Sequence, residues 1–137
     1  MKKISIVLLA FILITSSLFQ SCKYEEGPAL SLRTKKYRLT GTWKVEKIEE
    51  KDGDVFTPDN NNSIRYSFNK SGTGDVFIEI LSIETTQTID WEFTNSKKNL
   101  KITYENGDVA NTKILRLTND QLIVLNNDGD RWELDKQ

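Results

Sequence analysis

The sequence predicts an all-β domain: an eight-stranded antiparallel up-and-down barrel, preceded by a signal peptide and a short linker. From Gly41 onward, apolar and polar residues alternate with a period of two. Turn signals recur about every 8 to 12 residues, and the connections are short enough for antiparallel hairpins. A closed meander leaves no exposed sheet edge. An open two-sheet sandwich is the alternative, because periodicity alone does not separate the two architectures.

The first predicted strand, 41–49, shows how the alternation identifies an element. Trp43 and Val45 share one face, whereas Ile48 departs from the alternation, which predicts a bulge near Glu46 or Lys47. The later strands follow the same rule between turn signals rich in Gly, Asn and Asp. In chain order, the predicted strands are 41–49, 63–69, 75–84, 87–94, a segment that contains Leu100, Ile102 and Tyr104, then 109–117, 121–125 and 130–136.

The turns differ in how sharply the sequence defines them. Asp52-Gly53 and the polar residues 57–62 form a long connection after the first strand. Asn106-Gly107 predicts a two-residue hairpin of type I′, with positive φ at both residues. Both expectations rest on residue types that tolerate left-handed backbone.

The predicted strand 75–84 has apolar residues on both faces, although only one face can point into a barrel. Either the leucines of the lead-in segment cover the outer face, or an apolar patch is left for a partner or a membrane. The covering leucines would be Leu30, Leu32 and Leu39. The two faces of the strand carry Val76, Ile78 and Ile80 on one side and Phe77, Leu81 and Ile83 on the other.

The N-terminal segment has the order of an export signal. Lys2 and Lys3 precede an apolar stretch, 4–19, and Cys22 follows directly. The stretch is shorter than the roughly 20 residues of a spanning helix, so a permanent transmembrane anchor is the less favoured alternative. The residues Leu18-Phe19-Gln20-Ser21-Cys22 resemble a loose bacterial lipobox, in which the Cys is acylated with chains such as palmitate and becomes N-terminal.

These features divide the chain into a lipoprotein signal peptide at 1–21, a lipidated tether and lead-in at 22–38, and a barrel domain at 39–137. Acylation of Cys22 would make a membrane the first partner of the protein. The pair Glu25-Glu26 resembles acidic export tags of Bacteroidetes lipoproteins, with two solvated charges of a linker as the alternative. We therefore expect an exported, membrane-anchored protein of the cell envelope, on the periplasmic or surface face of the outer membrane.

The composition excludes several function classes. The chain of 137 residues has 19 Lys plus Arg against 20 Asp plus Glu, no His and one Cys. This balance gives no basic surface for nucleic acid, and the chain cannot form a His-based triad or a typical zinc site. Asp90 and Glu92 flank Trp91 like paired carboxylates, but solvated charges on a strand exterior explain them better. We expect no catalysis, no cofactor and no metal.

A resemblance to a known family rests on a short motif and on the order of later features. Leu39-Thr40-Gly41-Thr42-Trp43-Lys44-Val45 resembles the opening Gly-x-Trp strand of lipocalin-like proteins, entered from the basic turn 34–38. The pattern Tyr66-Ser67-Phe68-x-x-x-Gly72-x-Gly74, the strand around Trp91 and the segment 115–122 are similar to small lipocalin-like (calycin-type) lipoproteins of Bacteroidetes.

The resemblance implies a barrel with Gly41 and Trp43 at its closed base. In larger lipocalins, an Arg from a late strand covers that Trp. Arg116 and Arg131 are the candidates here, but neither lies in a matching motif, so this role is not carried over to either of them.

The interior of such a barrel supplies the candidate binding site. The function expected from it is a non-catalytic binding module for a small apolar or amphipathic ligand. The alternative is a filled barrel that acts as an accessory or inhibitor lipoprotein through a protein partner in the envelope. A cavity approaching roughly 300 Å³ would favour the first function and a solid interior the second. The candidate ligand-binding residues are Tyr66, Phe68, Ile78, Ile80, Trp91, Phe93 and Tyr104. Other residues expected to point inward include Ile102, Leu122, Val124, Trp132 and Leu134.

Overall fold

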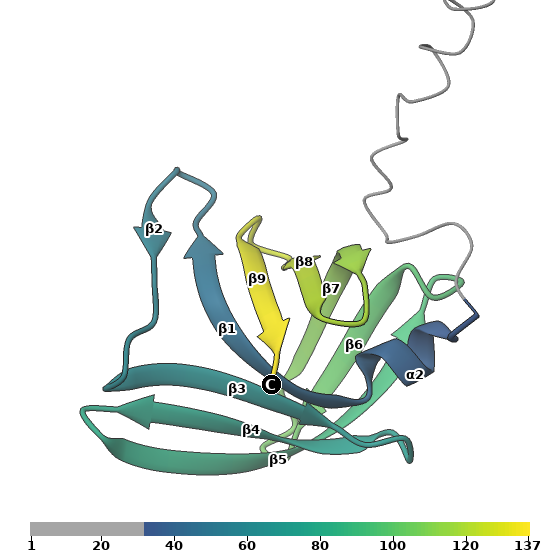
Figure 1. Cartoon of the computed structure of the whole chain (residues 1–137), viewed down its shortest axis with the longest axis horizontal. Coiled ribbons are helices and arrows are strands. Elements are labelled where there is room, and N and C mark those ends of the chain that lie inside the picture. The colour runs from purple at the N-terminus through teal and green to yellow at the C-terminus, as the bar shows by residue number, and fades with distance from the viewer. Residues whose placement is uncertain (1–31) are drawn as a thin grey trace, which may run out of the picture.

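The structure of the protein, a computed structural model, describes residues 32–137 (Figure 1). Cys22, the predicted signal peptide and most of the predicted tether lie outside the described residues. In the described part no helix has the length and apolar character needed to cross a membrane. The elements are α2 (Lys35–Leu39), β1 (Gly41–Glu49), β2 (Val55–Phe56), β3 (Asn62–Phe68), β4 (Thr73–Ile80), β5 (Ile83–Thr94), β6 (Asn99–Tyr104), β7 (Val109–Leu117), β8 (Gln121–Leu125) and β9 (Arg131–Lys136).

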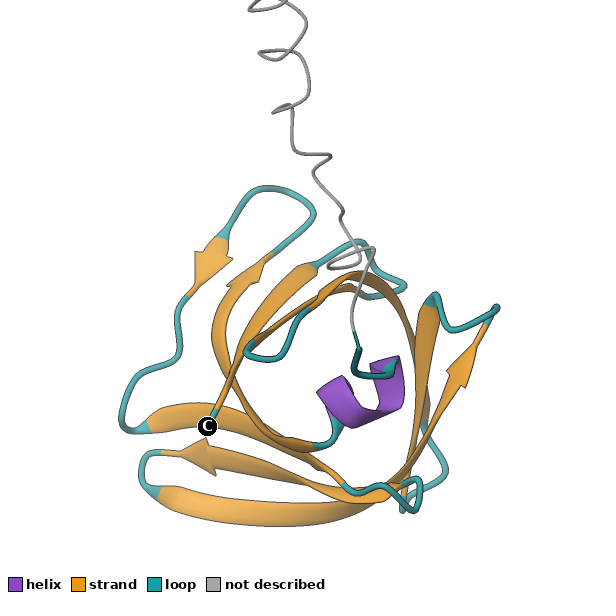
Figure 2. Ribbon diagram, turned by 45° about the vertical axis from the view of Figure 1, so that its right-hand side comes forward, coloured by secondary structure: helices purple, strands orange, loops and turns teal. Residues whose placement is uncertain are grey.

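The strands form a closed antiparallel barrel, as the alternation predicts. Eight strands follow one another in the order β1-β3-β4-β5-β6-β7-β8-β9, and β9 pairs with β1 to close the sheet. The short β2 pairs with the end of β1 beside the barrel. Figure 2 shows the strands as a ring with α2 lying across one opening. Closure excludes the sandwich alternative.

The barrel has two different ends, which follow from the strand directions. We call the end next to α2 the closed end; β1 starts there, and the β3–β4, β5–β6 and β7–β8 turns return there. The open end carries the β1–β2 loop and the β4–β5, β6–β7 and β8–β9 turns. This arrangement decides which loops can surround an internal cavity and which face the N-terminal segment.

The predicted strand 75–84 is wrong: the chain turns back within it. β4 ends at Ile80 and β5 begins at Ile83 and runs to Thr94, so the predicted gap before residue 87 is strand. Leu81 and Ser82 form the turn with φ of 51° and 65°, an unusual conformation for residues with a Cβ. Asn61 supports it, because its backbone carbonyl and side-chain oxygen accept from the Ser82 amide and hydroxyl at 3.3 and 3.2 Å.

Two other local predictions have different outcomes. The bulge near Glu46 is confirmed, because the pairing of β1 with β9 shifts between Val45 and Lys47. The type I′ turn is wrong, since Gly107 alone has positive φ there, at 90°. The Asn106 side-chain oxygen instead accepts from the Asp108 amide at 3.0 Å, an Asx-type contact that stabilises a longer turn.

The closed end is built around Trp43. Its side chain is fully buried, and its indole Nε1 donates to the Leu39 carbonyl at 2.7 Å. Lys136 lies over the ring with its Nζ 5.1 Å from the ring centroid and donates to the Arg38 carbonyl at 2.8 Å. Gly41 leaves room for this lysine, because a Cβ there would lie 2.7 Å from Lys136 Cε. Burial, with the charge of Arg33, lowers the pKa of Lys136.

Lys136 therefore covers Trp43, where the resemblance led us to look for an Arg. Neither sequence candidate covers the ring: Arg131 forms ion pairs with Glu49 and Glu133, and Arg116 is an exposed residue of β7. The sequence did not indicate that Lys136 would cover Trp43, because the family resemblance implies an arginine there.

The lead-in leucines that the structure describes do not cover the outer apolar face of the barrel. Leu39 belongs to the core, and Leu32 is fully exposed; Leu30 lies outside the described residues. Phe77 lies beneath Arg65, whose Cζ is 5.4 Å from the ring centroid. Three exposed apolar residues gather instead at the tip of the β4–β5 hairpin, where Ile80, Leu81 and Ile83 are 59%, 76% and 72% exposed.

Candidate functional site

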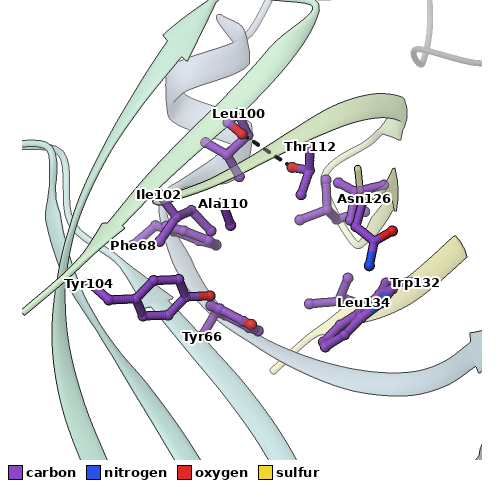
Figure 3. A pocket seen from close by; sticks show the side chains of 12 residues that line it. Tyr66, Phe68, Leu100, Ile102, Tyr104, Ala110, Thr112, Asn126, Trp132 and Leu134 are labelled. Carbon is purple, nitrogen blue, oxygen red and sulfur yellow. Dashed lines mark hydrogen bonds between the residues drawn. The ribbon is translucent and has the colours of Figure 1, made fainter. Parts of the chain in front are cut away.

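The barrel contains an apolar cavity of about 130 Å³. Side chains of β3, β6, β7, β8 and β9 surround it (Figure 3). These strands meet around one space because the barrel is closed, so residues from both halves of the sequence share it. The lining residues are Tyr66, Phe68, Leu100, Ile102, Tyr104, Ala110, Thr112, Leu122, Val124, Asn126, Trp132 and Leu134.

Two tyrosines give one side of the cavity its polar groups. The hydroxyl groups of Tyr66 and Tyr104 lie side by side and face the interior (Figure 3). Burial raises the pKa of Tyr66 well above its ordinary value of 10.0, and the charge and hydrogen bond of Tyr104 raise it further. Tyr66 therefore stays neutral at physiological pH and offers the cavity a hydroxyl group instead of a charge.

Asn126 and Trp132 lie together on the side of the cavity opposite the tyrosines (Figure 3). The β8–β9 turn holds the Asn126 amide: its Nδ2 donates to Asp130 at 3.0 Å, and its Oδ1 accepts from the Gly129 and Asp130 amides at 2.9 and 2.8 Å. The indole Nε1 of Trp132 is buried and has no hydrogen-bond partner within residues 32–137. A buried donor without an acceptor costs about 1 to 3 kcal/mol.

The seven predicted binding residues divide into two groups. Tyr66, Phe68 and Tyr104 line the cavity. The other four residues have different positions. Trp91 and Phe93 pack in the core behind Phe68 as an edge-to-face series, Ile78 packs against the same core, and Ile80 is exposed beyond the rim. These four do not line the cavity.

Trp91 differs from Trp132 in its polar contacts. Its Nε1 donates to the carbonyls of Asn69 and Thr73 at 3.1 and 3.0 Å. This indole is therefore satisfied by the β3–β4 turn and needs no ligand. On the outer face beside it, Glu92 forms an ion pair with Lys101 at 3.0 Å and Asp90 is exposed, an arrangement typical of solvated surface charge.

Four of the lining residues were not expected from the sequence at inward positions. Leu100 shares a strand face with Ile102 and Tyr104 and could have been found from the alternation. Ala110 and Thr112 share a face of β7 in the same way, but neither has a strong apolar signal. Asn126 follows Leu122 and Val124 at the same two-residue period, but it is polar and lies in the β8–β9 turn, so it has no apolar signal.

The ionisation of Tyr66 gives a testable dependence of stability on pH. Because folding raises its pKa, its contribution is complete below pH 10 and falls as the pH rises above 10 toward the folded-state pKa, by up to about 1.4 kcal/mol per pH unit. We expect Tyr66→Phe to remove this loss. Urea unfolding of both proteins between pH 8 and 11 checks it; parallel stability curves would contradict the assignment.

Comparisons with known proteins agree with this architecture. Residues 39–124, more than half of the chain, match the family described as "Lipocalin-like domain". A lipocalin-like protein from Bacteroides uniformis ATCC 8492 is 16% identical, with a TM-score of 0.63 over 73% of this chain and 99% of its own. An uncharacterized protein from Bacteroides eggerthii DSM 20697 is also 16% identical, with a TM-score of 0.61 over 72% and 98%. No curated protein sequence matches the chain. The family match, together with the closed barrel and its internal cavity, shows that the chain belongs to the lipocalin-like domain family.

Proposed function

We propose that the protein is a lipid-anchored, non-catalytic binding module of the cell envelope. Its barrel would hold a small apolar group that carries one hydrogen-bond acceptor. The observation that carries this proposal is the unpartnered indole N–H of Trp132 beside an apolar cavity. Ligand pockets are typically apolar with a few placed polar groups, and the Tyr66 and Tyr104 hydroxyls are the other such groups here.

The volume limits the ligand. A cavity of about 130 Å³ is below the roughly 300 Å³ of ordinary ligand pockets, but it is close to the roughly 150 Å³ of a cavity that admits benzene. A single ring or a short branched alkyl group fits this space. A longer amphipathic molecule would place one end inside and leave the rest at the open end.

Because Nε1 of Trp132 is itself buried, a ligand meets this N–H only after a small rotation of the indole, and the N–H then selects for an oxygen acceptor in the ligand. We expect cyclohexanone to bind about fivefold more tightly than methylenecyclohexane, which has nearly the same shape but no acceptor, because one neutral hydrogen bond contributes about 1 kcal/mol. Trp132→Phe should abolish this preference. NMR titration, with the Trp132 indole resonance as a reporter, gives both affinities.

A matched control comes from Trp91, whose Nε1 is already satisfied. Trp91→Phe makes the same chemical change outside the cavity and should leave the preference for the ketone intact. Equal affinities for the two probes in the unaltered protein, or no binding of either, would overturn the role of Trp132.

The anchor is tested at Cys22. Cys22→Ser should release the protein from membranes and remove the added acyl mass, because each buried CH₂ contributes about 0.8 kcal/mol to membrane binding. Membrane fractionation and intact mass spectrometry of protein from its own host check both results. Unchanged fractionation and unchanged mass would contradict lipidation.

The alternative function, an accessory or inhibitor lipoprotein, is favoured by the small cavity and by the exposed Ile80, Leu81 and Ile83 at the β4–β5 tip. Exposed apolar residues that lie together commonly mark contacts with another protein. Native mass spectrometry of protein from its own host separates the two functions. A reproducible small added mass supports ligand carriage, whereas a copurifying polypeptide supports association.

A further inference from the structure

The charges of the described residues separate toward the two ends of the barrel. The loops of the open end are acidic and contain one lysine, Lys51; three of their carboxylates, Glu50, Asp52 and Asp54, have oxygens within 4.8 Å of one another. The acidic residues of these loops are Glu50, Asp52, Asp54, Asp59, Glu105, Asp108, Asp128 and Asp130. At the closed end, α2 and the turns beside it are basic, and Asp120 in the β7–β8 turn is the acidic exception among residues 32–137.

The exposed lysines of the closed end form one surface, which we call the basic platform and define as Lys36, Lys70, Lys97 and Lys98. Contacts of α2 hold the parts together. Lys35 Nζ donates to the Lys97 carbonyl at 2.9 Å, which joins α2 to the β5–β6 turn. Lys36 and Lys70 line the same shallow hollow, which joins α2 to the β3–β4 turn.

The basic platform is not neutralised by the rest of the described chain. Ion pairs between residues 32 and 137 lie along the strands, as in Lys101–Glu92 and Arg65–Glu84, and include none of the four platform lysines. The strand lysines Lys47 and Lys101, by contrast, each have an acidic neighbour across the sheet, Glu133 and Glu92. The platform thus presents its positive charge to whatever faces the closed end.

An aromatic residue lies within this charged surface. Tyr37 is 45% exposed, and its ring has Arg33 Cζ at 4.9 Å and Lys70 Nζ at 5.2 Å from its centroid. Leu32 nearby in the chain is fully exposed. Tyrosine with flanking cations and a neighbouring apolar residue is the combination found at the interface of a bilayer, where the ring sits among headgroups and the cations meet phosphates.

The position of Cys22 in the chain favours a lipid bilayer as the partner of this surface. Leu32 lies ten residues after Cys22, and a fully extended segment of that length spans at most about 36 Å. The chain enters the barrel through α2, at the closed end. An acyl anchor at Cys22 would therefore hold the basic platform, and not the acidic open end, close to the lipid headgroups.

We propose that the basic platform docks on the anionic phosphate surface of the bilayer in which Cys22 is anchored. The barrel then stands with its closed end on the membrane and its acidic open end toward the aqueous phase, because an anionic surface attracts the first and repels the second. Ligand enters the cavity from the aqueous side in this orientation. The inference rests on the lipid anchor of the proposed function.

Lysine acetylation of the protein, purified from its own host and reconstituted with vesicles, tests this orientation. We compare pure phosphatidylcholine vesicles with vesicles that contain about 30% phosphatidylglycerol, and measure the acetylation rate of each lysine by mass spectrometry. In anionic vesicles the rates at Lys36, Lys70, Lys97 and Lys98 should fall about fivefold, while those at Lys51 and Lys101 stay unchanged. Sodium chloride at about 0.5 M should restore the platform rates, because salt screens surface electrostatics.

Paired variants separate the platform from net charge. Lys70→Glu with Lys98→Glu should abolish the protection of Lys36 and Lys97. Lys51→Glu with Lys101→Glu changes the net charge equally at other sites and should leave that protection intact. Circular dichroism verifies that both double variants fold.

The outcomes distinguish the docking from the anchor. Protein that fails to insert into either vesicle contradicts acylation and overturns the proposed function as well. Inserted protein whose lysines react equally in both vesicles overturns the docking alone. Protection seen in native envelopes but absent in protein-free anionic vesicles would assign the platform to an acidic protein partner and overturn the bilayer as its occupant.

Discussion

Trp43→Ala should lower the free energy of unfolding by about 3 to 5 kcal/mol, as expected for deletion of a large buried side chain. The indole is fully buried at the closed end and holds α2 through its hydrogen bond to the Leu39 carbonyl. The variant would lose a large fraction of the roughly 5 to 15 kcal/mol that stabilises a typical domain. Urea unfolding followed by circular dichroism measures the change.

Trp43→Phe is the matched control for this prediction. It keeps an aromatic ring beneath Lys136 but removes the Nε1 donor, so we expect a smaller loss that combines about 1 kcal/mol for the hydrogen bond with part of the packing. An alanine variant that unfolds at the same urea concentration as the unaltered protein would show that Trp43 does not organise the closed end.

Gly74→Ala should lower the free energy of unfolding by about 3 kcal/mol, at the upper end of the usual cost of overpacking. Gly74 is buried in β4 opposite Phe68, and a Cβ at this position would collide with the backbone carbonyl oxygen of Ser67 and lie 3.4 Å from Ile89 Cγ1. A backbone carbonyl cannot rotate away as a side chain can, so the two strands must separate. Thermal and urea unfolding both report the loss.

Gly53→Ala provides the comparison. Gly53 has φ of +99°, but no heavy atom lies within 4 Å of the place that a Cβ would occupy, so its substitution carries only the backbone cost of roughly 1 to 2 kcal/mol. A larger loss at Gly53 than at Gly74 would mean that the close approach of β3 and β4 is not what requires glycine there.

Under these two proposals, ligand binding and membrane docking use different parts of the barrel. Trp132, Tyr66 and Tyr104 line the cavity from strands that lead to the open end, while α2 and the turns beside it present the lysines. A change in the platform should therefore alter membrane orientation without altering affinity for a cavity probe, and a change at Trp132 should do the reverse.

Alternation along the chain was sufficient to predict the barrel, because a period of two leaves a clear pattern wherever one face of a strand is buried. It predicted β7 and β8 at their observed bounds and located the bulge of β1. It failed at Leu81-Ser82, where the turn has no glycine or asparagine of its own and depends on Asn61, which lies about twenty residues earlier in the chain.

The candidate site could be predicted only in part, because alternation shows which residues point inward but not which of them border the cavity. Tyr66, Phe68 and Tyr104 have the strand parity and size that indicate an inward position, and they line the cavity. Trp91 and Phe93 have the same signals but fill the core. Which inward residues pack together and which border an empty space depends on how the strands stagger around the barrel, and strand parity does not contain that information.

The sequence by itself determined the fold class, the order of the strands and the polarity of their faces, because these follow from local preferences and a two-residue period. Only the tertiary structure decided that Lys136 covers Trp43, that the Trp132 N–H lies unpaired beside the cavity, and that the lysines of α2 and two distant turns share one surface. Each of these depends on segments that are distant in the chain and that the closed barrel brings together, and contacts between distant segments leave no periodic trace in the chain.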